Sequence, residues 1–277
     1  MAWFLDLGGN WGNTLTLYED LRSRSHPFWT TVAFEASPLI QPFLRDSCAF
    51  LNGERENEPE NCLPRSGSTL HLLKYAKKYG CPSHPEDAGR KCMWNCLNFY
   101  LDALQPDPSL NSSNLVDRAL QTALLPAKNR DRYIHIPAAV SDTKGWTTIY
   151  EDPKQLIRGG AVQSIQKNLQ PKRVRTVDVA LWLLKLPQDA YVFLKMDIEG
   201  AEHKLVKRME LLGSHRRINR VSIECHGSCE RTMQIIKSWN VSIIEESQHG
   251  GMDDRSKSHL NRPIASGCGC SNRSRLY

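Results

Sequence analysis

The sequence predicts an α/β fold built on one mostly parallel sheet with helices on both faces. Short apolar stretches bounded by turn residues alternate with stretches of helical periodicity. Several apolar stretches end in an acidic or glycine-rich turn, as ligand-binding strands do in doubly wound sheets. With 277 residues, 40% of them hydrophobic, the chain is long enough for one large domain with its own core. We therefore predict a single domain over residues 1–277.

The first elements lie within the first 45 residues. The stretch WFLDLGG predicts a buried strand that runs into a glycine turn, and residues 13–24 have helical periodicity. The stretch TTVAFEASP predicts a second strand that ends at Glu35, and a helix is expected over residues 38–45.

The regular alternation fails between residues 46 and 114. This part is rich in Pro, Gly and charged residues, and we predict a cysteine-rich insertion with helices of its own after the second strand. Disulfides, buried thiols and a metal site all remain open for its cysteines, because no CxxC pair of the zinc-finger type occurs. The five cysteines are Cys48, Cys62, Cys81, Cys92 and Cys96.

The α/β alternation resumes after the insertion and continues to about residue 247. A helix over residues 115–125 leads into YIHIPAAVS, which we predict to be one strand, and WTTIYED is extended. The remaining elements are a strand edge and helix in RVRTVDVALWLL, a strand and helix in AYVFLKMDIEGAEHKLVKRM, a strand in RVSIECHG, a helix over 229–239 and a strand in NVSIIEES.

Charge and hydropathy exclude two kinds of partner. The 36 Lys and Arg against 30 Asp and Glu give a net charge of +6, spread without a dense basic run or an aromatic-studded RNA motif, so we expect no specific nucleic-acid partner. No run approaches the roughly 18 to 20 apolar residues of a membrane span. The sequence does not indicate a compartment.

Carboxylates gather at the predicted strand ends. Asp6, Glu35, Asp197 and Glu224 each lie in or next to the turn that follows a strand, and a further turn holds Ser141 and Asp142. Since the carboxyl ends of parallel strands meet at one edge of a sheet, these side chains predict a binding site there. Carboxylates at such a site bind hydroxyl groups, attract a cation or act as a base.

The first turn differs from a dinucleotide-binding fingerprint. Its glycines fall at Gly8, Gly9 and Gly12, and Asn10 stands where GxGxxG has its second glycine. An acidic residue just before the turn, Asp6, favours a cationic ligand such as the sulfonium of S-adenosylmethionine. Glu35, 29 residues after Asp6, suits the ribose of S-adenosylmethionine and that of NAD equally.

Six blocks together resemble one family. FLDLGGNWGNT, VAFEASP, AAVSDTKGWTTIY, TVDVALWLL, FLKMDIEGAEHKLVKRM and VSIECHG are similar, in this order, to the FkbM family of S-adenosylmethionine-dependent methyltransferases. LKMDIEGAE is the most specific of them. The resemblance implies a class I methyltransferase fold, Rossmann-like, with a seven-stranded sheet of order 3-2-1-4-5-7-6 and one antiparallel strand near its edge. It also implies O-methylation of a sugar, glycan or small-molecule hydroxyl.

The resemblance carries site roles onto individual residues. It implies that Asp6, Gly8, Asn10 and Gly12 hold the amino-acid end of S-adenosylmethionine, that Glu35 holds the ribose, and that Ser141 and Asp142 hold the adenine. It places Asp197 closest to the transferred methyl group. Because such proteins usually carry a leading segment over the cofactor, and only residues 1–3 precede the first strand, we expect cover from the insertion or from a segment absent from this chain.

Methyl transfer to a hydroxyl needs alignment and a base. Asp197 and His226 are the candidate bases. A divalent cation is not expected, although Asp197, Glu199, Glu224 and His226 offer the oxygens and nitrogen that one would need. Two other functions share the fold: a nicotinamide-dependent oxidoreductase, which the first turn argues against, and a non-catalytic binding module, which the intact carboxylates argue against.

Overall fold

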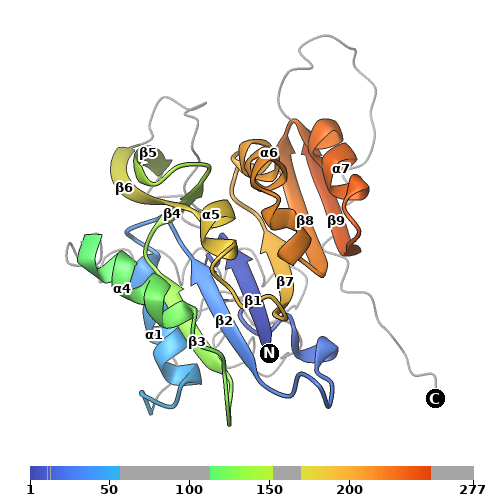
Figure 1. Cartoon of the computed structure of the whole chain (residues 1–277). Helices are drawn as coiled ribbons and strands as arrows, with labels where there is room; N and C mark the ends of the chain where they lie inside the picture. Colours follow the sequence, from blue (N-terminus) through green and yellow to red (C-terminus); the bar gives the residue numbers. More distant parts are fainter. Residues whose placement is uncertain (11, 13, 57–112, 152–169, 251–277) are drawn as a thin grey trace, which may run out of the picture.

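A six-stranded parallel sheet forms the centre of the computed structural model, which describes residues 1–10, 12, 14–56, 113–151 and 170–250. Its strand order is β3-β2-β1-β7-β8-β9, and every neighbouring pair is parallel (Figure 1). The strands are β1 (Ala2–Leu7), β2 (Trp29–Phe34), β3 (Arg132–Ile136), β7 (Tyr191–Met196), β8 (Arg220–Gly227) and β9 (Ser242–Gly250).

The alternation of side chains along β1 supplies both layers of the core. Trp3, Leu5 and Leu7 pack into a large cluster with residues of four helices on one face. Phe4 belongs to a second cluster on the other face, with α1 and the turns before β2. The helices are α1 (Gln41–Leu51), α4 (Ser113–Ala123), α5 (Val179–Leu183), α6 (Glu202–Leu212) and α7 (Cys229–Ser238), with short 3-10 helices at Glu19–Leu21 and Ser214–Arg217.

The strand order reverses between β1 and β7. The chain builds outward from β1 through β2 to β3, and then returns to the other side of β1 to build β7, β8 and β9. In parallel sheets the crevice at such a switch point, beyond the carboxyl ends of the strands, is where ligands bind. Of the predicted residues, Asp6 is the second-last residue of β1 and Asp197 directly follows β7, and these two strands flank the switch point.

The predicted strand YIHIPAAVS is in fact two strands in two sheets. It breaks after β3 at Pro137, which has no backbone N–H to donate to a sheet ladder. β4 (Ala139–Ser141) then joins a separate three-stranded sheet of order β4-β6-β5, with β5 at Gly145–Glu151 and β6 at Gln170–Asp178.

The predicted helix over residues 13–24 is wrong. This part forms successive turns with hydrogen bonds between residues three apart, followed by the 3-10 helix Glu19–Leu21. Leu15 and Tyr18, which are three residues apart, are both fully buried, so burial of this pair selects the tighter winding. The helix expected over residues 38–45 exists but begins later, as α1 at Gln41–Leu51.

Other expectations meet the structure in part. The α/β class and the mostly parallel sheet are confirmed. Among the described residues the central sheet has six strands, all parallel, and the expected seventh, antiparallel strand is not part of it. Most of the predicted insertion, including Cys62, Cys81, Cys92 and Cys96, lies outside them. Cys225 and Cys229 are buried thiols without a disulfide. Within the described parts of the chain, no helix has both the length and the apolar character for a membrane crossing.

Candidate active site

Glu35, directly after β2, is held by the backbone of two neighbouring turns. Its carboxylate accepts hydrogen bonds from the backbone N–H of Asn10 at 2.8 Å and of Ser37 at 2.7 Å. Burial raises the pKa of Glu35 to about 7, against the lowering effect of these two N–H groups. Asn10 has a φ of 44°, a left-handed conformation that asparagine tolerates, and this turns its N–H toward Glu35. The structure thus brings the predicted residues Asn10 and Glu35 together.

Several buried polar atoms near Glu35 have no hydrogen-bond partner among the described residues. They include Asn10 Oδ1 and Gln41 Oε1. The carboxylate of Glu151, at the end of β5, is buried beside them, and its one described side-chain hydrogen-bonding neighbour is the Ser37 hydroxyl. Glu151 is fully buried, interacts electrostatically with Glu35, and has a pKa raised by burial. Because buried polar atoms are rarely left without partners, this shell of acceptors indicates a ligand that carries hydrogen-bond donors.

Asp6, at the end of β1, is fully buried and already paired. Lys195 Nζ, on β7, lies 3.2 Å from Asp6 Oδ1 and donates to the Gly8 carbonyl at 2.7 Å. The Thr14 hydroxyl donates to Asp6 Oδ2 at 2.7 Å. Burial lowers the pKa of Lys195, but Asp6 and Asp197 outweigh it, so the net direction is upward. Lys195 is therefore a charged structural partner of Asp6, as expected for a lysine inside an apolar strand.

The acidic turn after β7 is organised by Glu202, the first residue of α6. Its carboxylate accepts hydrogen bonds from the backbone N–H of Ile198 at 3.0 Å and of Gly200 at 2.9 Å, and the side chain is fully buried. Glu199, between them, has a φ of 52°. A carboxylate at this position satisfies N–H groups that a helix start leaves open, and it fixes the turn that carries Asp197 and Glu199.

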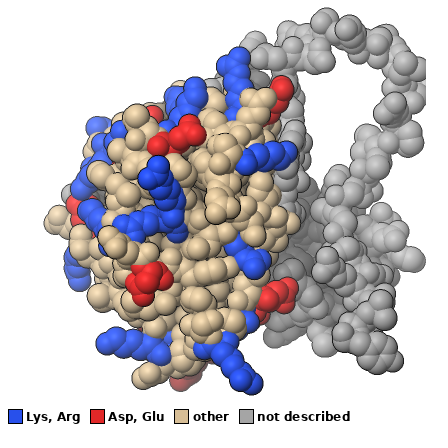
Figure 2. Space-filling view, turned by 45° about the vertical axis from the view of Figure 1, so that its right-hand side comes forward, with Lys and Arg blue, Asp and Glu red and all other residues tan. Residues whose placement is uncertain are grey.

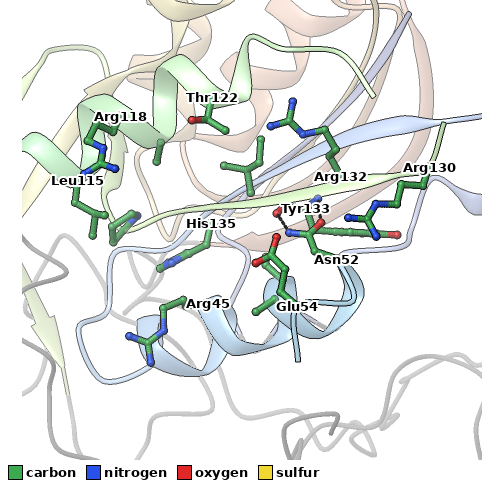
Figure 3. Close-up of a pocket in the computed structure, with 15 residues that line it drawn as sticks. Arg45, Asn52, Glu54, Leu115, Arg118, Thr122, Arg130, Arg132, Tyr133 and His135 are labelled. Carbon is green, nitrogen blue, oxygen red and sulfur yellow. Dashed lines mark hydrogen bonds between the residues drawn. The ribbon is translucent and has the colours of Figure 1, made fainter. Parts of the chain in front are cut away.

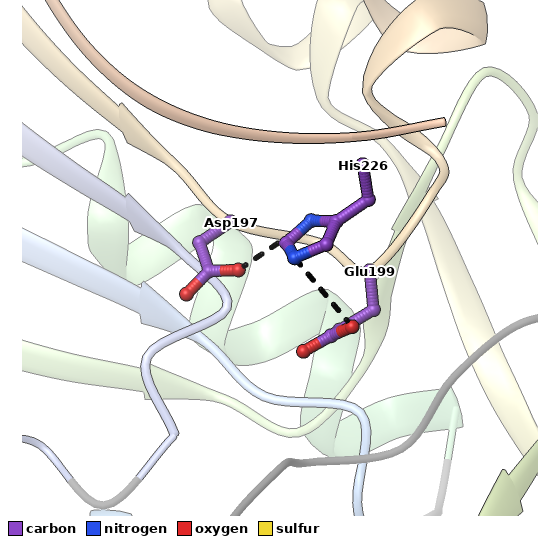
Figure 4. Close-up of side chains that lie close together, drawn as sticks. All are labelled: Asp197, Glu199 and His226. Carbon is purple, nitrogen blue, oxygen red and sulfur yellow. Dashed lines mark ion pairs between the residues drawn. The ribbon is translucent and has the colours of Figure 1, made fainter. Parts of the chain in front are cut away.

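His226, at the end of β8, reaches the same turn from the neighbouring strand. Its Nδ1 lies 3.2 Å from Glu202 Oε1, and its Nε2 lies 3.9 Å from Glu224. Figure 4 shows His226 between Asp197 and Glu199, with Nε2 at 3.8 Å from the Glu199 carboxylate. The hydrogen bond to Glu202 is the main cause that raises the pKa of His226 to about 9. The imidazole is therefore protonated at neutral pH in this arrangement and is not a free base.

Asp197 stands between the two groups. Its Oδ2 is 3.7 Å from Lys195 Nζ, and its Oδ1 is 4.0 Å from His226 Nδ1. Burial raises the pKa of Asp197, with Lys195 acting in the opposite direction and Glu224 adding to the rise. The two candidate bases of the sequence therefore lie together, as predicted.

Comparison with known proteins agrees with this geometry. A model of the methyltransferase FkbM domain matches residues 76–258, about two thirds of the chain. The chain belongs to the FkbM methyltransferase family. Neither the search of curated proteins nor that of solved structures gave a match.

The family match begins within the predicted insertion and leaves the first two strands outside it. Those strands belong to the same sheet, since β1 pairs with β7 along its whole length from Ala2 to Leu7. The turn with Asp6 and the LKMDIEGAE segment are thereby neighbours in space: the Asp197 N–H donates to the Leu7 carbonyl at 2.9 Å. The fold thus brings β1, which lies outside the FkbM match, next to LKMDIEGAE, which lies inside it.

The remaining predicted cofactor residues lie at two places. Gly8 and Gly12 have φ values of 83° and 77° and form the turn after β1. Ser141 and Asp142 lie at the end of β4 in the smaller sheet, where the Ser141 hydroxyl is 3.1 Å from Asp142 Oδ1. No described hydrogen bond or ion pair joins these two residues to Glu35, so their contact with adenine stays a prediction.

A separate hollow lies along the outer edge of the sheet, between α1, α4 and β3 (Figure 3). It has a volume of about 480 Å³, and its lining includes Arg45, Arg118, Arg130 and Arg132 but none of the predicted site residues. His135 in its wall has a pKa lowered to about 3 by burial. On the face seen in Figure 2, Lys and Arg are scattered among other residues instead of forming one patch. Neither feature adds to the strand-end site.

The strand-end residues fit S-adenosylmethionine. Ribose hydroxyls and the amino groups of this cofactor are hydrogen-bond donors, which the buried acceptors around Glu35 would satisfy. Sequence reasoning missed Ser37, Gln41 and Glu151 because the strand-end pattern gives no signal for them. It also missed the contact between Glu202 and His226, because the two residues lie on different elements, 24 residues apart.

Proposed function

We propose that this chain is an S-adenosylmethionine-dependent O-methyltransferase that acts on a hydroxyl of a sugar, a glycan or a small molecule. Membership of the FkbM methyltransferase family supports methyl transfer. The single observation that carries the proposal is the group of buried acceptors around Glu35, of which Asn10 Oδ1 and Gln41 Oε1 have no hydrogen-bond partner among the described residues, next to the switch point at which Asp197 follows β7. This arrangement favours a donor-rich cofactor on one side and an acceptor on the other.

Each group has one task in the proposed reaction. Glu35, with Asn10 and Ser37 holding its carboxylate, would bind the ribose hydroxyls, and the other acceptors would bind the remaining donors. When bound, S-adenosylmethionine supplies an electrophilic methyl group on a sulfonium. Asp197 would take the proton of the acceptor hydroxyl, because the protonated His226 donates to Glu202.

The oxygen specificity follows from the acidic character of the site. Carboxylates from β7 and β8 orient hydroxyl groups through hydrogen bonds that they accept. A base within hydrogen-bond reach accelerates the reaction of a hydroxyl by about 10²- to 10⁴-fold. Lys195 lies closer to Asp6, at 3.2 Å, than to Asp197, at 3.7 Å, and Asp6 is fully buried, so we assign Asp197 and not Asp6 to the acceptor.

Two measurements test the proposal. Equilibrium titration should show binding of S-adenosylhomocysteine and none of NAD, and the reverse result would favour an oxidoreductase. Asp197→Asn should bind S-adenosylhomocysteine almost normally yet transfer labelled methyl groups at least about a hundredfold more slowly, roughly 2.7 kcal/mol, across a panel of glycan and small-molecule acceptors. Asp189→Asn, at an exposed turn before β7, is the matched control and should keep full activity. Full activity of Asp197→Asn would remove its assignment as the base.

A further inference from the structure

The hollow at the outer edge of the sheet, between α1, α4 and β3, has the size and the charge of an anion site. Its volume of about 480 Å³ lies within the roughly 300–1,000 Å³ of small-molecule pockets. Of the described residues that line it, Glu54 is the one acidic residue, against the four arginines Arg45, Arg118, Arg130 and Arg132. A cleft lined mainly by one sign of charge attracts ligands of the opposite sign.

One end of the hollow is formed by Arg45, Arg118 and His135 (Figure 3). Arg45 is near enough to His135 for its positive charge to add to the effect of burial, which lowers the pKa of the imidazole. The guanidinium of Arg118 makes no hydrogen bond or ion pair with the described residues. His135 Nε2 is buried and also has no hydrogen-bond partner among them. Because buried polar atoms are rarely left without partners, this atom indicates a ligand independently of the charges.

Arg130 and Arg132 form the opposite end of the hollow. Arg130 Nη1 lies beside Gly53, just after α1, and Arg132 Nη1 donates a hydrogen bond to the Leu125 carbonyl at 3.2 Å. A carbonyl is a neutral acceptor, so neither guanidinium has an acidic partner within the described residues. Three residues of β3 separate Arg132 from His135, which corresponds to about 10 Å of extended strand. The two ends are therefore spaced to bind two anionic groups of one small molecule.

Glu54 distinguishes this hollow from a surface that binds anions by charge alone. Its side chain lies between His135 and Arg130 in Figure 3, and it makes no ion pair with the described residues. A carboxylate repels an anion, but it accepts hydrogen bonds from hydroxyl groups. The hollow thus has positive charge at both ends and a hydroxyl acceptor between them, which matches a hydroxyl-bearing molecule with an anionic group at each end.

We infer that the hollow between α1, α4 and β3 binds a sugar that carries phosphate or sulfate groups, at a site separate from the strand-end site. A guanidinium binds the oxygens of such groups through paired hydrogen bonds, and Arg118 and Arg132 each hold one group. Glu54 accepts hydrogen bonds from the sugar hydroxyls, and His135 Nε2 donates to the group beside Arg118. The inference does not depend on the proposed function, because none of these residues belongs to the cofactor or catalytic set.

Calorimetric titration of the full chain with sugar phosphates tests the inference. Fructose 1,6-bisphosphate should bind at least about tenfold more tightly than fructose 6-phosphate, since hydrogen bonds to a second charged group are gained. Arg118→Gln and Arg132→Gln should each weaken binding of the bisphosphate at least about tenfold. Arg231→Gln, at an exposed position of α7, is the matched control and should bind it like the parent. Circular dichroism and S-adenosylhomocysteine binding verify that each variant is folded.

Two further arms identify the ligand. A sulfated disaccharide is titrated in parallel, and the tighter of the two probes shows whether phosphate or sulfate is the anionic group. Glu54→Ala should narrow the preference for the bisphosphate over inorganic pyrophosphate, which has no sugar hydroxyls, and an unchanged preference would overturn a sugar as the ligand. The site itself is wrong if neither probe binds saturably, if the bisphosphate and the monophosphate bind equally, or if Arg231→Gln weakens binding as much as Arg118→Gln.

Discussion

Two acidic groups lie on either side of Asp197, and they differ in how their charge is satisfied. The inner pair, Asp6 with Lys195, is buried and neutral overall, and Thr14 completes the hydrogen bonds of the carboxylate. In the outer cluster, Glu199 and Glu224 face His226, and all three side chains are partly exposed.

This difference distinguishes a buried ion pair that stabilises the fold from side chains that can contact a ligand. A buried charge that has its partner holds two strands in place, and losing the partner is costly. Partly exposed titratable groups at the rim of a switch point are candidates for contact with a ligand. The inner pair therefore belongs to the scaffold of the site, and the outer cluster is where we propose that the acceptor binds.

The largest expected effect is that of a methyl group at Gly8. A Cβ there would lie 1.8 Å from the Asp197 carbonyl oxygen, and φ is 83°, so Gly8→Ala should lower the free energy of unfolding by at least about 4 kcal/mol. Gly200→Ala, in the outer turn, has a φ of 102° but no atom within 4 Å of the new Cβ, and should cost only about 1–3 kcal/mol. Urea denaturation measures both. Equal losses would show that the two ends are equally tightly packed.

Removal of the inner cation should come next. Lys195→Met leaves Asp6 buried without its ion pair, which typically costs about 3–5 kcal/mol of unfolding free energy. Lys207→Met, on the exposed face of α6, is the control and should change the stability by less than about 0.5 kcal/mol. Pairing Lys195→Met with Asp6→Asn should recover part of the loss, since the buried charge is then gone. A loss no larger than that of Lys207→Met would contradict the structural role of the pair.

The smallest effect concerns Glu35, and it appears as a dependence on pH. Burial raises its pKa from 4.5 to about 7 in the folded protein, where Glu151, Lys195 and the N–H groups of Asn10 and Ser37 face it. Between these values the unfolded chain has lost a proton that the folded protein keeps. Stability should therefore fall as pH rises from about 4.5 to about 7, by about 3 kcal/mol in total, and then level off.

Denaturation of Glu35→Gln across the same pH range isolates this contribution. The difference in unfolding free energy between parent and variant should change with pH, whereas Glu210→Gln, at an exposed position, should follow the parent. Parallel curves for Glu35→Gln and the parent would show that Glu35 titrates normally in the folded state.

Much of the site was predictable because strand ends are local features. The acidic residue within WFLDL and those directly after VAF and FLKM lie at the ends of apolar runs, and the parallel sheet brings them to one edge. The helix over residues 13–24 was mispredicted because its periodicity is local, while burial of Leu15 and Tyr18 against the sheet selected turns. The break at Pro137 is the opposite case, because its cause is local: proline has no backbone N–H, and this alone predicts that a strand ends there.

The sequence by itself determined the α/β class, the position of each strand-end carboxylate and the family resemblance, because these depend on periodicity and on short motifs. Only the tertiary structure decided which carboxylates are already paired. Asp6 and Asp197 look alike in the sequence, but Lys195 neutralises Asp6 inside the sheet, while Asp197 faces His226 from the next strand. The free energy of a charge depends on its burial and its nearest partners, and strands far apart in the sequence supply both.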